Sequence, residues 1–210
     1  MQRPRVPVVG LIGGVGSGKS SLARWISDQL RVCVISGDEA GHRTLNKPDV
    51  RRSIRARFGD QVFDNKGEIR RDQLAARVFG ADEGSRRNRR DLEDIVHPVI
   101  REDLRGQLET ARRDADLDLI LVDAAVLLEA GWNQLCDAVV FIDTPLDQRQ
   151  QRVRDGRGWS ADELKKREES QLSLQEKRAA ADLIVDNSRS IELAGRQLLN
   201  WIKQRLSTST

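Results

Sequence analysis

Short apolar runs alternate with amphipathic stretches along most of the chain. Apolar runs bounded by turn residues predict five buried strands, at 6–12, 32–35, 117–122, 138–142 and 183–185. Apolar residues three and four positions apart predict helices between and after them, the longest at 18–30, 84–113 and 190–206. Since strands and helices alternate, we expect an α/β fold with a parallel sheet covered by helices on both faces.

One long segment in the first half interrupts this alternation. Its pattern predicts helices and two short extended pieces around a turn, at 39–46, 49–58, 62–69, 71–79 and 84–113. No apolar run in this segment is typical of a parallel strand. We therefore expect a mostly helical insertion over residues 39–113.

The whole chain, residues 1–210, is expected to form one domain that includes this insertion. Its core is predicted to comprise 1–38, 114–148 and 180–206. Between the last two pieces, the pattern Ser-Ala-Asp-Glu at 160–163 is typical of a capping box that begins a helix. The Ser/Thr tail at 207–210 has no pattern that predicts order.

The turn after the first apolar run carries the pattern G-x-x-x-x-G-K-S, from Gly13 to Ser20. Glycines let the backbone approach an anion closely, and successive N–H groups at a helix N-terminus attract phosphate. Lys19 adds an ammonium for the β- and γ-phosphates, and Ser20 a hydroxyl oxygen suited to Mg²⁺. The residues predicted to bind a nucleoside triphosphate are Gly14, Val15, Gly16, Ser17, Gly18, Lys19, Ser20 and Ser21. A glycine-rich turn with a chance lysine is disfavoured, because the strand, loop and helix are all present.

In a parallel α/β sheet, ligands bind beyond the carboxyl ends of the strands, so carboxylates at those ends are candidates for chemistry. Asp38 follows the second apolar run and is predicted to position a hydroxyl acceptor and take its proton. The same position suits an N-cap for the helix at 39–46. Asp123 ends the third run and is predicted to reach Mg²⁺ through water, with a simple turn aspartate as the alternative.

Four arginines follow the fourth apolar run, at positions 149, 152, 154 and 157. A mobile segment that carries guanidinium groups can neutralise charge on a transferring phosphoryl group and exclude water. Residues 149–179 are therefore predicted to form a lid region, with Arg149 and Arg152 on one helix face. The alternative is that these arginines are surface groups paired with Asp147 and Asp155.

Composition narrows the possible partners. The 36 basic and 33 acidic residues leave a net charge of only +3, and the arginine clusters are interleaved with acids rather than with aromatic residues. Such clusters are typical of solvated helix faces, so we expect no nucleic-acid partner. Cys33 and Cys136 form no CxxC motif, so neither zinc nor a structural disulfide is expected. The absence of a signal peptide or an apolar run of membrane-spanning length predicts a cytoplasmic protein without a membrane partner.

Together these features resemble the dephospho-CoA kinase family along nearly the whole chain. The glycine loop at 10–20 is close to that family's version. The order and spacing of the other matches are specific: Arg71…Leu74…Val78-Phe79, Leu92…His97-Pro98, Asp123…Leu127-Leu128-Glu129, Gln171…Lys177-Arg178, and Ala-Asp-Leu-Ile-Val-Asp-Asn at 181–187.

The resemblance implies transfer of the ATP γ-phosphate to the ribose 3′-hydroxyl of dephospho-CoA, with ATP and Mg²⁺ as cofactors. It also implies a P-loop NTPase fold, a three-layer α/β/α structure with a five-stranded parallel sheet, a helical CoA-binding insertion and a lid. By motif position, Lys19, Asp38, Arg152 and Arg157 would be catalytic, and Asn187 would line the adenine pocket. The residues implied to bind dephospho-CoA are Asp38, Arg71, His97, Leu127 and Glu129, and those implied to bind the metal are Ser20 and Asp123.

The chain departs from the family pattern at two places. Ser36-Gly37-Asp38 stands where the family has D-x-D, so one carboxylate is missing and Asp123 gains importance for the metal. Ala125 replaces the proline of a P-L-L motif, which should loosen that turn. His97 also fits a satisfied, partly buried helix residue.

Two other functions fit the glycine loop. The first is another P-loop kinase, with a nucleoside, a nucleoside monophosphate or a shikimate-type acceptor, because a fold does not determine its substrate. The second is a regulatory P-loop module that binds nucleotide and a protein or nucleic acid.

Overall fold

The computed structural model describes residues 5–80 and 82–208. The chain divides into two compact units. An α/β unit combines Met1–Ser36 with Gln107–Thr210, and a helical unit comprises Gly37–Gly106. Among the described residues, no helix combines the length and apolar character needed to cross a membrane.

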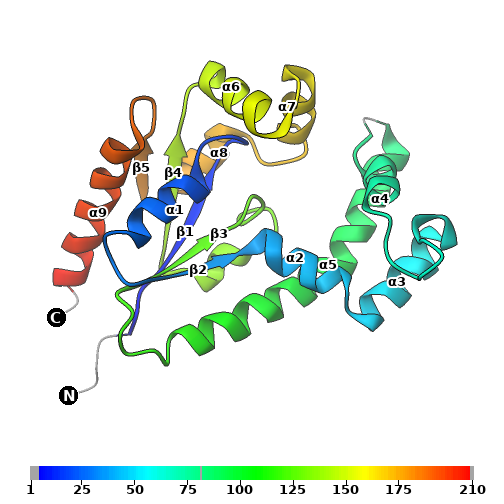
Figure 1. Ribbon diagram of the computed structural model, residues 1–210, viewed down its shortest axis with the longest axis horizontal. Helices are drawn as coiled ribbons and strands as arrows, with labels where there is room; N and C mark the ends of the chain where they lie inside the picture. Colours follow the sequence, from blue (N-terminus) through cyan, green and yellow to red (C-terminus); the bar gives the residue numbers. More distant parts are fainter. Residues whose placement is uncertain (1–4, 81, 209–210) are drawn as a thin grey trace. The chain divides into compact units, whose positions relative to one another are not determined.

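The α/β unit contains the predicted sheet of five parallel strands (Figure 1). The strands are β1 (Val8–Gly13), β2 (Val32–Ser36), β3 (Leu119–Asp123), β4 (Ala138–Asp143) and β5 (Leu183–Asp186). Their order across the sheet is β2-β3-β1-β4-β5. Because every pairing is parallel, the carboxyl ends of all five strands lie along one edge, with the glycine loop after β1 at its centre.

Helices α1 (Lys19–Ser27) and α9 (Ile191–Thr208) pack on one face of the sheet. The main apolar cluster of this layer contains Val9, Leu11, Leu22, Ala23, Ile26, Leu119, Leu121, Val140, Ile142, Val185, Ala194, Leu198 and Ile202. On the opposite face, the segment that contains Leu127 and Cys136 packs closely on β1. A Cβ on Gly10 would lie 2.5 Å from Leu127 and 3.0 Å from the Cys136 sulfur. The predicted three layers are therefore confirmed.

Among the described residues, the rest of the α/β unit comes from four more helices and the end of a long one. These are η2 (Trp132–Leu135), α6 (Leu146–Arg157), α7 (Ala161–Glu168), α8 (Leu174–Ala179) and the end of α5 (Glu83–Ala111). The tail prediction is wrong for residues 207 and 208, because α9 extends through them, and residues 209–210 lie outside the described part of the chain.

The helical unit has an apolar core of its own. Its elements are α2 (Gly37–Leu45), α3 (Pro48–Phe58), η1 (Asp60–Val62), α4 (Arg71–Val78) and most of α5. The core cluster contains Val50, Ile54, Phe58, Val62, Phe63, Leu74 and Val78. The predicted turn is present as an antiparallel bridge between Phe63 and Ile69, although Val62 belongs to η1 and is not extended.

Two helix starts differ from expectation. Helix α2 begins at Gly37, so Asp38 lies inside its first turn and the N-cap interpretation is wrong. At the start of α7, the Ser160 hydroxyl accepts the Glu163 N–H at 3.2 Å as predicted, but the Glu163 carboxylate pairs with Arg167 one turn on. A complete capping box occurs at the start of α8, where none was expected from the sequence.

Candidate active site

The glycine loop connects β1 to α1 through backbone conformations that favour glycine. Gly13, Gly16 and Gly18 have φ values of 152°, 78° and 91°. Gly18 is the N-cap of α1 and provides no side-chain acceptor, so the first N–H groups of the helix lack a side-chain cap. N–H groups at a helix start point along the helix axis, where they attract an anion. The loop therefore has the geometry that the sequence predicts for a phosphate site.

The predicted metal residues lie together at this loop. Ser20, in the first turn of α1, donates its hydroxyl to a carboxylate oxygen of Asp123 at 2.5 Å. They meet because β3, which ends at Asp123, pairs directly with β1. Both groups are hard oxygen donors of the kind that Mg²⁺ prefers. The two side chains therefore fit the predicted metal site, in which Ser20 would contribute its hydroxyl and Asp123 would act through water.

The Ser17 carbonyl oxygen is held by donors from two strand ends and from α6. The Thr144 hydroxyl donates to it at 2.9 Å, Arg152 at 3.2 Å and the Asn187 amide at 2.8 Å. Arg152 also donates to the Asn187 carbonyl at 3.4 Å. Two predicted residues, Arg152 and Asn187, are thus brought to the loop. No role was predicted for Thr144, although it lies just beyond the carboxyl end of β4, where the sheet predicts ligand-binding residues.

The turn that presents Asn187 is fixed by its neighbours. Hydrogen bonds from Ser188 hold the pKa of the Asp186 carboxyl below its usual range. Asn187 is only 1% exposed. Its side-chain oxygen is buried and has no hydrogen-bond partner among the described residues. An unsatisfied buried acceptor of this kind can accept a hydrogen bond from a ligand.

Arg149 is buried beside the loop rather than paired at the surface. It is 4% exposed, its Nε donates to the Thr144 carbonyl at 3.1 Å, and its Nη1 pairs with Glu168 at the end of α7. The alternative of surface pairing with Asp147 or Asp155 is therefore wrong for Arg149. Its predicted position on the same face as Arg152 is confirmed, because both contact the loop. Glu168 was not predicted, and no sequence motif marks it.

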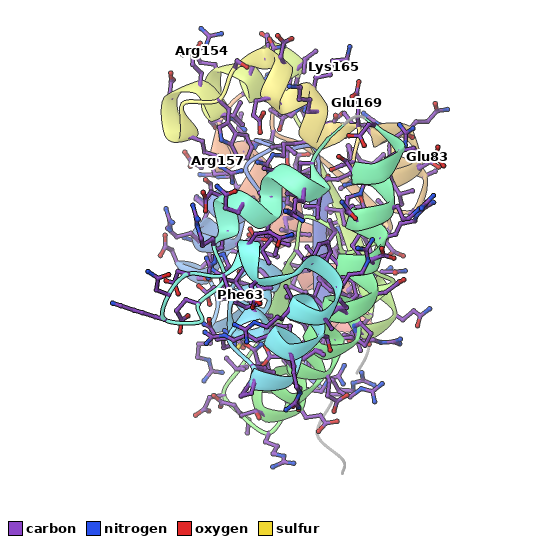
Figure 2. The ribbon with its side chains drawn as sticks, turned by 90° about the vertical axis from the view of Figure 1, so that its right-hand side faces the viewer. Phe63, Glu83, Arg154, Arg157, Lys165 and Glu169 are labelled. Carbon is purple, nitrogen blue, oxygen red and sulfur yellow. The ribbon has the colours of Figure 1, made fainter. Side chains whose placement is uncertain are left out.

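Arg157, at the end of α6, is exposed. Its guanidinium carbon lies 4.8 Å from the centre of the Trp159 ring, and that of Arg167 lies 4.9 Å from the same ring. These are cation–π distances, so both guanidinium groups contact the indole ring in the turn between α6 and α7. Figure 2 shows Arg154 and Lys165 extending outward from these two helices. The catalytic role of Arg157 stays a prediction.

Leu127 and Glu129 both contribute to packing. Leu127 is 0% exposed and covers Gly10 of β1. One carboxylate oxygen of Glu129 accepts from the Leu172 N–H at 2.9 Å and pairs with Lys177 at 2.9 Å. Lys177 is 1% exposed and also donates to Gln171 at 2.8 Å. The matched segments at 127–129 and 171–178 are therefore linked, and the role of Leu127 and Glu129 in substrate binding stays a prediction.

The remaining predicted residues belong to the helical unit. Asp38 is exposed in the first turn of α2, Arg71 is the exposed first residue of α4, and His97 is half-buried in α5 beside Pro98. Ser36, two residues before Asp38, pairs with Asp123 in the sheet register. Their predicted roles depend on chemistry with a bound acceptor and stay predictions.

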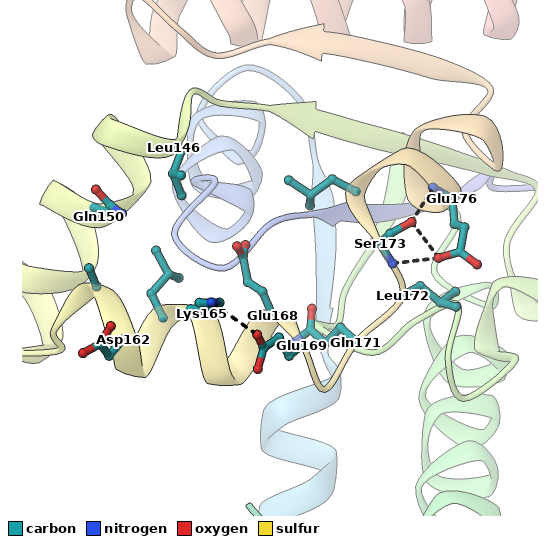
Figure 3. A pocket seen from close by; sticks show the side chains of 13 residues that line it. Leu146, Gln150, Asp162, Lys165, Glu168, Glu169, Gln171, Leu172, Ser173 and Glu176 are labelled. Atoms are coloured by element: carbon teal, nitrogen blue, oxygen red, sulfur yellow. Dashed lines mark hydrogen bonds and ion pairs between the residues drawn. The ribbon is translucent and has the colours of Figure 1, made fainter. Parts of the chain in front are cut away.

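A cavity of about 770 Å³ lies between α6, α7 and the segment that leads into α8. Its lining includes Leu146, Gln150, Leu164, Glu168, Gln171 and Leu172. In Figure 3 the Glu168 side chain projects from α7 into this space, whereas Glu169 pairs with Lys165 at 3.8 Å. Since Glu168 also contacts the loop at Val15, one wall of the cavity is joined to the phosphate site.

These features define the class of the protein. A G-x-x-x-x-G-K-S loop between the central strand of a parallel sheet and a helix, with a carboxylate from the adjacent strand on its serine, is the site of a P-loop nucleotide-binding kinase. A family model for dephospho-CoA kinase matches residues 7–192. The chain therefore belongs to the dephospho-CoA kinase family.

Individual proteins agree with this assignment. A dephospho-CoA kinase of Corynebacterium diphtheriae is 35% identical over 203 residues, which cover 96% of this chain and 98% of that protein. The crystal structure of TT1252 from Thermus thermophilus has a TM-score of 0.78 at 26% identity and covers 96% and 98% of the two chains. A dephospho-CoA kinase structure from Campylobacter jejuni, at 23% identity, shares the fold with a TM-score of 0.67 and coverage of 97% and 98%. The family and the fold class expected from the sequence are thus confirmed.

Proposed function

We propose that this protein transfers the γ-phosphoryl group of ATP to the ribose 3′-hydroxyl of dephospho-CoA, giving coenzyme A and ADP, in the last step of CoA synthesis. The observation that carries the proposal is the family match over residues 7–192. All residues that the sequence predicts to act in the site lie within that span. The family match does not favour another acceptor or a purely regulatory role.

The phosphates are proposed to bind at the start of α1. The N–H groups of the helix start and the Lys19 ammonium provide positive charge for the β- and γ-phosphates. Asn187 is proposed to line the adenine pocket, where its buried side-chain oxygen could accept from the base. Ser20 and Asp123 are proposed to hold Mg²⁺, which when bound would neutralise part of the phosphate charge.

The acceptor hydroxyl is proposed to meet Asp38. As the ribose oxygen forms its bond to the γ-phosphorus, the bond from that phosphorus to the β–γ bridging oxygen breaks. The hydroxyl proton passes to the Asp38 carboxylate, which returns it to solvent. Arg152 and Arg157 are proposed to place positive charge near the transferring group.

The regions take roles that follow from these positions. Residues 39–113 are proposed to bind the CoA moiety, with Arg71 and His97 as contacts, and 149–179 to act as a lid over a core of 1–38, 114–148 and 180–206. Leu127 and Glu129 are proposed to affect substrate binding through the turn at 125–131, in which both lie. A cytoplasmic location is part of the same proposal.

A panel of acceptors in one coupled ADP-release assay tests the activity. Purified protein with Mg-ATP is supplied with dephospho-CoA, adenosine, AMP or shikimate at equal concentrations, with the Lys19→Ala variant as the inactive control. We expect rapid ADP release only when dephospho-CoA is the acceptor. Mass spectrometry and NMR should then find a 3′-phosphate in the product. ADP release at the acceptor-free rate would overturn the proposal, and a faster rate with another acceptor would reassign the substrate.

A further inference from the structure

The peptide group between Gly14 and Val15 is held on both sides. Its carbonyl oxygen, on Gly14, accepts from the Ser17 N–H at 3.1 Å and from the Lys19 ammonium at 3.4 Å. Its N–H, on Val15, donates to a carboxylate oxygen of Glu168 at 3.1 Å. The orientation of this one peptide plane therefore links a carboxylate of α7 to the ammonium of the phosphate site.

Arg149 holds the Glu168 carboxylate in place. Its Nη1 pairs with the same oxygen that accepts the Val15 N–H, and lies 3.5 Å from the Val15 carbonyl. The guanidinium is 4% exposed and the carboxylate 23% exposed. A buried guanidinium needs a counter-ion, so this pair is a fixed feature of the loop's surroundings.

The pair of Arg149 and Glu168 can approach the loop because Gly14 has no side chain. A Cβ on Gly14 would lie 2.7 Å from the Arg149 guanidinium and 2.9 Å from the Glu168 carboxylate. The carboxylate uses the Val15 N–H and not the first N–H groups of α1, so it leaves those groups to a phosphate.

We propose that Glu168 is a positioning residue for Lys19. By accepting the Val15 N–H it fixes the Gly14–Val15 peptide with its carbonyl toward the Lys19 ammonium, which directs that ammonium to the phosphates. Without an acceptor at this point the peptide can rotate, and its carbonyl leaves both Lys19 and the Ser17 N–H. The inference rests on the proposed function, because it assumes that Lys19 acts on phosphates.

Two substitutions at this position separate the hydrogen bond from the charge. Glu168→Gln keeps an oxygen that accepts the Val15 N–H but removes the counter-ion of Arg149, whereas Glu168→Ala removes both. Glu169→Gln and Glu169→Ala are matched controls, because Glu169 is the next residue, is 63% exposed and pairs with Lys165 instead. Circular dichroism at the assay temperature establishes that each variant is folded.

Kinetics with ATP and dephospho-CoA then distinguish positioning from a merely structural role. We expect Glu168→Ala to lower kcat/KM for ATP about tenfold, with the KM for dephospho-CoA unchanged. Glu168→Gln should recover most of this loss, and both Glu169 variants should match the wild type. Equal losses in Glu168→Gln and Glu168→Ala, or no loss in either, would overturn the positioning role.

Measurements without an acceptor keep this inference separate from the proposed function. By calorimetry, Glu168→Ala should bind ADP about tenfold more weakly than Glu169→Ala. In the wild type, the Val15 amide should exchange slowly with solvent by NMR, and a rapidly exchanging amide would contradict the bond to Glu168 even if the Ala variant did not fold. Weaker ADP binding without dephospho-CoA turnover would retain the positioning role and reject the substrate. Turnover of dephospho-CoA together with unaltered ADP binding in Glu168→Ala would retain the substrate and reject the positioning role.

Discussion

Asp38 is the side chain on which the proposed proton transfer depends. Replacing it by asparagine keeps the size and removes the ability to take a proton, so Asp38→Asn should lower kcat about 10²- to 10⁴-fold. The ATP dissociation constant should stay close to that of the wild type. Steady-state kinetics and calorimetry measure the two effects, with Glu39→Gln on the same exposed turn as the control. A large rise in the ATP dissociation constant would instead mean that Asp38 serves nucleotide binding.

Cys136 provides a test of burial by pH. Its sulfur packs against Gly10, and burial raises the pKa of the thiol from 9.0 to about 12. Between pH 9 and pH 12 the thiol of the unfolded chain loses its proton while that of the folded chain keeps it. The folded protein therefore shows no penalty from this thiol below pH 9, and its free energy of unfolding falls as the pH rises above 9. The loss is about 1.4 kcal/mol per pH unit for this group.

Urea unfolding of the wild type and of Cys136→Ala from pH 8 to pH 11 measures this contribution. Above pH 9 the free energy of unfolding should fall more steeply in the wild type. The difference in slope should approach that of one titrating proton, about 1.4 kcal/mol per pH unit. The comparison cancels the titration of lysines and arginines common to both proteins. Equal slopes would mean that the folded protein ionises the thiol as easily as the unfolded chain does.

Individual site residues differ in how far the sequence could predict them. Ser20 and Asp123 were predicted to act together, and they meet because a motif fixes one and a strand end fixes the other. Glu168 and its pairing with Arg149 could not be found in this way. Their contact depends on the path of the chain between α6 and α7, and no periodicity or motif encodes that path.

At the scale of elements, apolar runs predicted all five strands, because each strand coincides with a short apolar run bounded by turn residues. The expectation that all five are buried is wrong for β2 and β5, which lie at the two edges of the sheet and leave Val34 42% and Ile184 41% exposed. The order of the strands was not predicted. It depends on packing between segments that are far apart in the sequence, which the local pattern of residues does not encode. Helix starts were less certain for a local reason. Serine and aspartate stabilise either the N-cap or the first turn, as Asp38 and Ser160 illustrate.

The contact between α1 and α9 depends on one missing side chain. Gly195 lies against Trp25, and a Cβ there would be 2.2 Å from the indole ring. Gly195→Ala should therefore lower the free energy of unfolding by about 1–3 kcal/mol, although alanine favours helix by about 1 kcal/mol. Chemical denaturation measures the change.

Gly106→Ala, in α5, is the matched control for this substitution. A Cβ at Gly106 would meet no atom within 4 Å, so the same exchange should stabilise the protein by about 0.5–1 kcal/mol through helix propensity. Stabilisation by both substitutions would show that the two helices separate easily at Trp25.

For the whole molecule, balanced charge predicts weak attraction to polyanions. The net charge is +3, and many arginines lie within 4.0 Å of acids, as Arg57 does with Asp91 and Arg178 with Asp143. In fluorescence anisotropy with a single-stranded 20-mer at 150 mM salt, we expect no binding at micromolar protein. Tight binding with a steep salt dependence would favour the regulatory alternative.

The position of β1 at the centre of the sheet has a consequence for biosynthesis. Val8 pairs with Ile120 and Val9 with Ala138, so the first strand to leave the ribosome has no neighbours until most of the chain has been translated. The helical unit draws its core from residues near one another in sequence and can become compact during that delay. We expect nascent chains to acquire protease-resistant structure first in residues 37–106, with nucleotide-dependent protection appearing only after β4 emerges.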